Sequence, residues 1–422
     1  MPHQATLTVR ARIRAGQVPQ LKAVLDRAGV EAERRRLFPF EELPVHFARL
    51  FVLDESEDLK GAVLPATLFF LSDVDAPLED YLTRVGRVAA AGLDDVFSLC
   101  EDYPSQPTAE SRVAFMRAHA LKPAALYVNT VGRSLQQVRQ EAALRDALSD
   151  FLDEHAAKLD GQDASRLWAT IVEHVGNRPD LRWALEPAAR PAAAWRARQL
   201  AAAALQVLIA VILLPVALVL LPVFLVLLRI HEVRDKTIRQ IATPEHIAEL
   251  EAREDWIVQN QFTAIGLRKP GPFRGVTVVV VLLILDFGCR HIFDRGNLAG
   301  VRTIHFARWV FVDGHRRILF VSNYDGSLES YMDDFIDKVA FGLNAVFSNG
   351  VGYPQTNWLV LDGAKDELAF KSLLRDRQVV TPVWYSAYPD LTADNIANNA
   401  AIRAGLCRDL SPAEASAWAA RL

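Results

Sequence analysis

The sequence predicts an α+β fold in which two related units flank a hydrophobic helical segment. The first observation is an internal repeat, because residues 72–104 align without a gap to residues 322–354, with 13 of the 33 pairs identical. The tetrapeptide HFAR likewise occurs at residues 46–49 and again at residues 305–308. The second observation is an uncharged stretch between the two copies. A repeat of this length constrains the architecture before any motif is considered.

The first unit can be followed element by element. Apolar and polar residues alternate over residues 7–13, which is the period of a strand with one buried face. After Gly16, apolar residues fall at helical spacing and predict an amphipathic helix. The remaining predicted elements are strands at 45–53 and 66–71, a helix at 78–91, a strand at 124–129 and a final helix at 135–152.

The second unit has the same predicted order. Its elements are a strand at 262–268, a helix at 276–285, strands at 305–312 and 318–322, a helix at 328–341 and a strand at 383–387. The order β-α-β-β-α-β is that of the ferredoxin-like fold. Each such unit has one open sheet face, so we expect the two to pack sheet to sheet as a pseudo-dimeric α+β barrel. The predicted repeats are residues 1–157 and 257–422, joined through linkers at 158–199 and 230–256.

Residues 200–229 are predicted to be a membrane segment. Residues 200–228 carry no charge, whereas about 20 apolar residues are enough to span a bilayer. A straight helix of this length would be roughly 43 Å long, which exceeds the ~30 Å hydrocarbon core. Pro215 and Pro222 should kink or break it. If both repeats form one barrel, they lie on one side of the membrane, so we expect a helical hairpin or kinked helix that enters and leaves by the same face.

Arginines at 196, 198 and 229 flank this segment and favour a cytoplasmic position for both ends. The predicted location is therefore membrane-associated, with cytoplasmic soluble domains. Residues 276–285 are also intensely apolar, and we interpret them as a domain helix that is buried on one side and contacts lipid on the other. In the alternative, this helix carries the chain back across the membrane. The two half-barrels then lie on opposite faces of the membrane, and each pairs with that of another chain in a homo-oligomer.

The linker at 230–256 is a candidate amphipathic helix rich in charges of both signs. It is either a solvated surface helix or one that rests on lipid headgroups through Arg234, Lys236 and Arg239.

Composition and motifs exclude several classes of function. The net charge of −4 gives no basic field for nucleic acid, so no nucleic-acid partner is expected. Three widely separated cysteines predict neither a disulfide framework nor a zinc site. The chain has no P-loop, G-x-S-x-G, H-E-x-x-H, C-x-x-C or dinucleotide fingerprint, which argues against hydrolase, kinase and Rossmann dehydrogenase functions.

Polar and aromatic residues of the second copy are the candidates for a small-molecule pocket. Residues shared by both copies are explained most simply by the fold, whereas aromatic walls with a few amide groups are typical of ligand sites. The alternative is a turn-rich surface, since Asn and Gly also form turns. The candidate ligand-binding residues are Asn323, Tyr324, Asn349, Tyr353, Trp384, Tyr385, Tyr388, Asn395 and Asn399.

His305 and Arg308 are further candidates. Strand alternation places His305 on the face of Ala307 and Arg308 on the opposite face, so the two are not expected to line one cavity. The histidine is interpreted either as a hydrogen-bonding residue at a strand end or as a ligand of a metal or haem iron.

Over residues 5–150 and 258–407, the element order and the duplication resemble the dimeric α/β-barrel superfamily. That superfamily includes dye-decolourising peroxidases, chlorite-dismutase-like haem proteins and cofactor-free monooxygenases. Dye-decolourising peroxidases carry G-x-x-D-G, of which residues 322–326 (SNYDG) keep the final Asp-Gly, with Ser322 in place of the first glycine. The resemblance implies Asp325 as distal acid, Arg308 as its catalytic partner and His305 as proximal haem ligand.

Two functions follow from these observations. The first is a membrane-associated oxidoreductase, peroxidase- or monooxygenase-like and either haem-dependent or cofactor-free. Its expected partners are the lipid bilayer and an apolar small molecule delivered from it. The second is a non-catalytic, membrane-anchored ligand-binding or scaffold protein.

Overall fold

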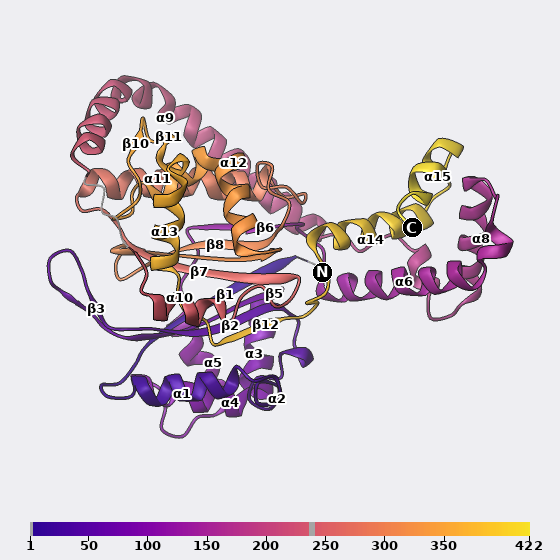
Figure 1. Ribbon diagram of the computed structural model, residues 1–422, viewed down its shortest axis with the longest axis horizontal. Coiled ribbons are helices and arrows are strands. Elements are labelled where there is room, and N and C mark those ends of the chain that lie inside the picture. Colours follow the sequence, from indigo (N-terminus) through magenta and orange to yellow (C-terminus); the bar gives the residue numbers. More distant parts are fainter. Residues whose placement is uncertain (1–2, 236–240) are drawn as a thin grey trace.

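Two four-stranded antiparallel sheets lie face to face at the centre of the protein, in a computed structural model that describes residues 3–235 and 241–422 (Figure 1). The first sheet has the order β1 (Gln4–Arg12), β5 (Thr67–Asp75), β2 (Val45–Leu53) and β12 (Val383–Ser386). The second has the order β6 (Ala125–Val128), β8 (Ile304–Val312), β9 (Arg317–Asp325) and β7 (Gln259–Leu267). The predicted α+β class and strand positions are therefore confirmed.

Helices cover the outer face of each sheet and give four layers (Figure 1). Below the first sheet lie α1 (Val18–Ala28), α2 (Glu31–Leu37), η1 (Phe40–Glu42), α3 (Leu78–Val88), α4 (Ala90–Phe97) and α5 (Ala109–Ala118). Above the second lie α11 (Pro272–His291), α12 (Leu328–Phe347) and α13 (Glu367–Arg377). The inner faces pack on each other through Phe51, Phe69 and Leu71 of the first sheet and Val310, Leu319 and Val321 of the second. Short elements are β3 (Ser56–Glu57), β4 (Val63–Leu64), α10 (Pro244–Glu251), β10 (Thr356–Asn357), β11 (Leu361–Asp362) and η3 (Gly363–Lys365).

The fourth strand of each repeat lies in the sheet of the other repeat. We had expected each unit to contain its own fourth strand, but β6 pairs with β8 and β12 pairs with β2. The two pairings are equivalent, since Tyr127 lies opposite Ala307 and Tyr385 lies opposite Ala48. Because the repeats offer matching strand edges, a four-residue strand can pair with either. The exchange joins the two halves through backbone hydrogen bonds.

The helices that follow the exchanged strands form an arm that projects from the body (Figure 1). It contains α6 (Leu135–Glu154), α7 (Ala156–Leu159), α8 (Ala164–Asn177), η2 (Arg182–Leu185), α14 (Ala393–Leu406) and α15 (Pro412–Ala419). Its own small core includes Leu144, Leu148, Ile171, Ile402 and Trp418. Much of the predicted linker at 158–199 therefore packs against the second repeat.

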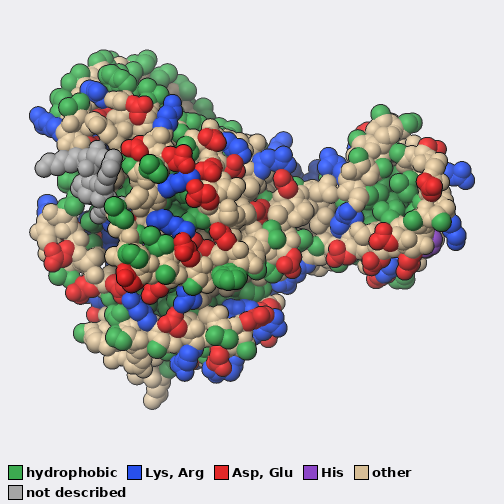
Figure 2. All heavy atoms as spheres, viewed as in Figure 1, with side chains coloured by type: hydrophobic (Ala, Val, Ile, Leu, Met, Phe, Trp, Pro, Cys, Tyr) green, Lys and Arg blue, Asp and Glu red, His purple; other side chains and the backbone are tan. Residues whose placement is uncertain are grey.

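The predicted membrane segment is one continuous helix, α9 (Ala193–Arg234), of 42 residues. Of the two expected forms, a helical hairpin or a kinked helix, the structure has the second, since no turn interrupts the helix at Pro215 or Pro222. The two prolines are seven residues apart, close to two helical turns, so their bends point in nearly the same direction and add into an arch (Figure 1). Apolar side chains cover the arch (Figure 2).

Both ends of α9 contact the body. At the N-terminal end, the Trp195 ring lies 5.1 Å from the His3 ring. At the C-terminal end, the Glu232 carboxylate is fully buried and accepts hydrogen bonds from the Thr356 hydroxyl (3.0 Å) and the Leu359 backbone N–H (2.7 Å). These contacts fix the two ends of the arch on the same side of the protein.

Two of the described helices, α9 and α11, are long and apolar enough to cross a membrane. They differ in burial. Within the most apolar 18-residue stretch of each helix, 6% of the stretch is buried in α9 and 33% is buried in α11. α11 is twice as long as the predicted helix and, as expected, buries one side (Val278, Leu282) and exposes another (Val280, Ile284). In the charged linker, Lys236 and Arg239 lie outside the described residues.

Candidate functional site

Arg308 of β8 crosses from the second sheet into the first. It is buried, and its Nη1 donates to the Leu7 carbonyl (2.7 Å) and the Thr8 hydroxyl (3.0 Å). Its Nη2 donates to Asp73 Oδ1 (2.8 Å) in a buried ion pair. Arg308 therefore connects the two sheets through a charged contact in the dry interior.

Arg49 of β2 makes the equivalent crossing in the opposite direction. Its Nη1 donates to the Phe262 carbonyl (3.0 Å) and the Thr263 hydroxyl (2.8 Å), and its Nη2 donates to the Ser322 carbonyl (2.9 Å). Its amide partner is Asn323, the residue that replaces Asp73 in the second repeat. Arg49 thus has acceptors on every side but no carboxylate of its own.

The two crossings therefore bring two guanidinium groups to one carboxylate, that of Asp73. Burial lowers the pKa of Arg49 to about 9, the nearby Asp73 opposes that shift, and Arg308 adds to it. Arg49 remains charged at neutral pH, since this pKa lies above 7. Such a network can stabilise the contact between sheets, but it offers no free group to a substrate.

A pair of histidines lies at one end of the sheet interface. His46 and His305 occupy β-bulges, where the strand register shifts between residues 45 and 47 and between residues 304 and 306. The extra residue in the bulge shifts the alternation of side chains between the two faces of the strand. His305 therefore lies on the same face as Arg308, toward Phe47 of the other sheet. The prediction of opposite faces is wrong for this reason, although Arg308 does not line the cavity beside His305.

Each histidine binds the aspartate that ends the neighbouring strand. His46 Nε2 lies 3.0 Å from Asp75 Oδ1, and His305 Nε2 lies 2.7 Å from Asp325 Oδ1. His46 Nδ1 also lies 3.0 Å from the Tyr388 hydroxyl. A carboxylate that holds an imidazole in one orientation is the arrangement used by histidines that transfer protons.

The same aspartates bind the helices of the arm. Asp75 Oδ2 accepts from the backbone N–H of Leu135 (2.9 Å), the first residue of α6. Asp325 Oδ2 accepts a hydrogen bond from the backbone N–H of Ala393 (2.7 Å), the first residue of α14. Each carboxylate therefore joins a histidine to a helix N-terminus, where negative charge is favoured.

His46, His305 and Tyr388 line a cavity of about 30 Å³. This is room for a water molecule, since a single water needs ~10–15 Å³. A haem group does not fit, because cofactor sites are typically roughly 300 Å³ or larger and His305 Nε2 is already bonded to Asp325.

Only some of the predicted site residues lie together. Asn323, Asp325, Trp384 and Tyr388 lie between the sheets with His305 and Arg308, and the Trp384 indole donates to Asn323 Oδ1 (3.1 Å). The others lie apart from this group: Tyr324, Asn349 and Tyr353 beneath the helices of the second sheet, Tyr385 beneath those of the first, and Asn395 and Asn399 on α14. The structure therefore does not assemble the expected pocket of aromatic and amide side chains.

Sequence reasoning gave too little weight to Arg49, His46, Asp73 and Asp75. The signal was present, since the HFAR tetrapeptide and Asp75/Asp325 recur in both copies. The expectation that residues shared by both copies serve the fold alone leaves these residues out. In the structure these shared residues form the polar centre.

A wide cleft lies at the other end of the sheet interface. Its volume is about 840 Å³, and it lies between the end of β2, α10 and the segment of residues 376–382. Carboxylates and cations both line it: Asp26, Asp54, Glu55, Glu57, Glu249 and Asp376, with Lys22, Arg253, Arg317, Arg377 and His246. Arg253 and Asp26 approach to 3.2 Å across it.

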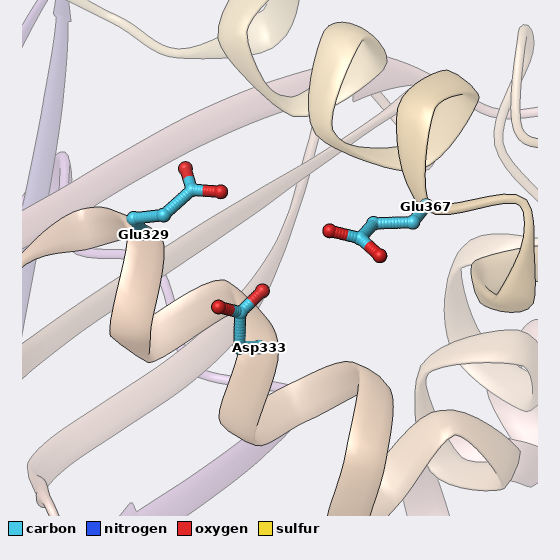
Figure 3. A group of neighbouring side chains, drawn as sticks. All are labelled: Glu329, Asp333 and Glu367. Carbon is cyan, nitrogen blue, oxygen red and sulfur yellow. The ribbon is translucent and has the colours of Figure 1, made fainter.

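An acidic group on α12 and α13 does not form a metal site. The carboxylates of Glu329, Asp333 and Glu367 point toward one another (Figure 3). Lys371 Nζ lies among them, 2.6 Å from Asp333 and 2.7 Å from Glu367, and also pairs with Glu329. The ammonium group therefore occupies the position that a cation would take.

Comparison of this chain with models of known families, with characterised proteins and with solved structures gave no match.

Proposed function

We propose that this is a membrane-anchored binding or scaffold protein, held to one face of a lipid bilayer by α9. The observation that carries this proposal is the apolar surface of α9, most of whose large side chains are exposed (for example Leu213 and Val219). A helix that is apolar on all sides needs protein or lipid around it. Complete transfer of an exposed Leu, Ile or Val side chain from water gains roughly 1.5–3 kcal/mol. The exposed part of each side chain on α9 would gain a share of this, so lipid is the environment that suits this surface.

The arch suits entry and exit at one membrane face. Both ends of α9 contact the body, at Trp195 and at Glu232, so a crossing that separates the ends would break one of these contacts. Arg196, Arg198 and Arg229 lie at the ends of the apolar stretch and favour the cytoplasmic side. The exposed side of α11 is then a second lipid-facing surface.

The fold that we propose is a pair of ferredoxin-like repeats related by duplication and joined as a pseudo-dimeric barrel. The internal repeat and the facing sheets support it. This fold would differ from two self-contained ferredoxin-like units in one respect, the exchange of β6 and β12 between the two sheets. The distant resemblance to the dimeric α/β-barrel superfamily is a proposal of the same kind.

Binding is favoured over catalysis because the interior is filled. The sheet interface holds the Arg49–Arg308 network and a cavity of about 30 Å³, whereas the cleft at the opposite end has about 840 Å³. Six carboxylates against four Lys and Arg residues line that cleft. We therefore propose the cleft as the binding site, for a polar or cationic ligand or partner segment in place of the apolar molecule first expected.

A cofactor-free oxidoreductase is the second candidate. The observation in its favour is the His46–Asp75 pair beside the Tyr388 hydroxyl at a cavity that can hold water. Such a group can accept or pass a proton. This function would require the interior to open for a substrate.

Membrane extraction tests the first proposal. The wild-type protein is expected to stay in the membrane fraction after alkaline carbonate treatment. The triple variant Val211→Lys, Leu214→Lys, Leu218→Lys should be released, because a charge at the centre of a membrane helix costs about 3 kcal/mol. The matched control is Val30→Lys, Leu59→Lys, Val63→Lys, which places three lysines at exposed apolar positions outside α9. Release of the wild type, or labels at residue 3 and residue 422 in opposite compartments, would refute the proposal.

A further inference from the structure

A second cavity lies where the arm joins the body. Its volume is about 490 Å³, and its walls come from the loop before α6, from α6 and α14, and from residues 187–191. Four arginines line it, Arg133, Arg190, Arg403 and Arg408, against one carboxylate, that of Glu141. This excess of positive charge occurs in a protein whose net charge is −4.

Two of these arginines already have acidic partners. Arg403 Nη1 lies 3.3 Å from Glu141 Oε1, and Arg408 Nη1 lies 2.8 Å from Glu414 Oε1. The side chain of Glu141 is 1% exposed and is also bonded to Gln137 (2.8 Å). One carboxylate, that of Glu141, therefore faces Arg133 and Arg403 together, and the cavity keeps an excess of positive charge.

Among the described residues, neither Arg133 nor Arg190 donates a side-chain hydrogen bond, and Arg133 has only the longer-range attraction of Glu141. Arg133 is partly buried and lines both this cavity and the cavity of His46 and Tyr388. Arg190 is exposed in the loop that leads into α9. A partly buried guanidinium group without an acceptor is costly, so this position favours an anion.

Further polar atoms in the wall also lack a partner. Arg403 Nε and Glu141 Oε2 are buried, and neither has a hydrogen-bond partner in the described part of the chain. The rest of the wall is small and apolar, with Pro187, Ala400 and Ala404 among its residues. A ligand with a charged group and a compact apolar or polyol part would fit both features.

We propose that this cavity binds a phosphate group, held between Arg133 and Arg190 and carried either by a soluble organic phosphate or by a lipid headgroup. Phosphate suits the site because its oxygens can accept from two guanidinium groups that approach from different elements. Its negative charge offsets the excess positive charge of the four arginines that line the cavity. Because Arg190 lies three residues before α9, the bound phosphate would also order the loop at the base of the membrane helix.

Thermal unfolding of the full chain in detergent tests this proposal with two probes at constant ionic strength. Glycerol 3-phosphate is compared with glycerol, and micelles containing phosphatidic acid are compared with micelles containing diacylglycerol. A rise in Tm with glycerol 3-phosphate identifies a soluble phosphate as the ligand, and a rise only with phosphatidic acid identifies a lipid headgroup. If neither phosphate compound raises the Tm above its phosphate-free control, the proposal is wrong.

Four variants locate the effect. Arg190→Gln is exposed and should fold normally, and it should weaken phosphate binding about tenfold, the effect of one charge-assisted hydrogen bond. Glu141→Gln removes the facing negative charge and should strengthen binding. Arg166→Gln, an exposed arginine of α8 outside the cavity, is the matched control and should bind as the wild type does. Equal affinity of the wild type, Arg190→Gln and Arg133→Gln would also overturn the proposal.

Discussion

Asp73 and Asn323 occupy the same position in the two repeats and are hydrogen-bonded to each other, Asn323 Nδ2 to Asp73 Oδ2, at 3.2 Å. They stand where the crossings of Arg308 and Arg49 meet. If both residues were aspartate, two carboxylates would face each other in the dry interior. If both were asparagine, two guanidinium groups would share no counter-charge. The difference between the repeats therefore places one negative charge between two positive ones.

Asp73→Asn is expected to destabilise the protein by about 3–5 kcal/mol, because it leaves two buried guanidinium groups without a carboxylate. The measurement is chemical unfolding in detergent, followed by the fluorescence of the tryptophans. Asn323→Asp is the matched control. It supplies each arginine with a carboxylate and should cost less than Asp73→Asn. A loss below 1 kcal/mol for Asp73→Asn would contradict the role assigned to this ion pair.

Much of the fold followed from local patterns. Residues 45–53 were predicted as a strand and form β2 with the same bounds, since a run of nine mostly apolar residues between turns has few alternatives. The exchange of β6 and β12 could not be predicted. A strand of four residues has the same pattern in whichever sheet it pairs, and the choice depends on contacts distant in the sequence.

The site was harder to predict than the fold. Strand alternation assigned His305 to the wrong face, because one bulge residue reverses the parity and leaves no mark in a single sequence. Tyr324 and Tyr385 resembled pocket residues, yet they pack among the helices, where a tyrosine ring contributes as much apolar area as a phenylalanine. Asn395 proved to be part of a helix cap with Thr392.

Glu232→Gln should loosen the segment of residues 356–362 from α9. The carboxylate accepts hydrogen bonds from Thr356, Trp358 and Leu359, and hydrogen bonds to a charged group contribute about 1.5–3 kcal/mol each. We expect faster amide exchange at Trp358 and Leu359, measured by mass spectrometry, with unchanged exchange in β1. Glu249→Gln on α10 is the control. Protection that matches the wild type at both amides would show that this carboxylate does not hold the segment.

Haem-supplemented expression should yield a protein without a Soret band. The cavity beside His305 has about 30 Å³, and Asp325 already binds the imidazole. The measurement is a visible absorption spectrum of detergent-purified protein. A Soret band that disappears in His305→Ala would contradict this expectation and restore the haem-dependent oxidoreductase.

Cys407 should be the first of the three thiols to be alkylated. Burial raises the pKa of Cys100 to about 12, so at pH 8 roughly one molecule in 10⁴ carries its thiolate, and Cys289 is buried within α11. Cys407 is less buried, and its pKa is raised less far. Iodoacetamide labelling followed by peptide mass spectrometry measures the order. Equal labelling of Cys100 and Cys407 in the folded protein would be inconsistent with the burial described here.

Glu141 should make the stability of the arm depend on pH. Burial raises its pKa, against the opposing effects of Gln137, Arg133 and Arg403. A carboxyl group whose pKa is raised on folding contributes stability that is complete below its unfolded pKa of about 4.3 and is lost as the pH rises through the folded pKa. Glu141→Gln is neutral at every pH and lacks this loss. The Tm of Glu141→Gln minus that of the wild type should therefore increase from pH 4 to pH 8. The lost contact with Arg403 adds an offset that does not change the sign of this slope. The control is Glu154→Gln on the same helix, for which the Tm difference from the wild type should not change with pH. If the Tm difference for Glu141→Gln is also constant from pH 4 to pH 8, Glu141 ionises as easily in the folded protein as in the unfolded chain.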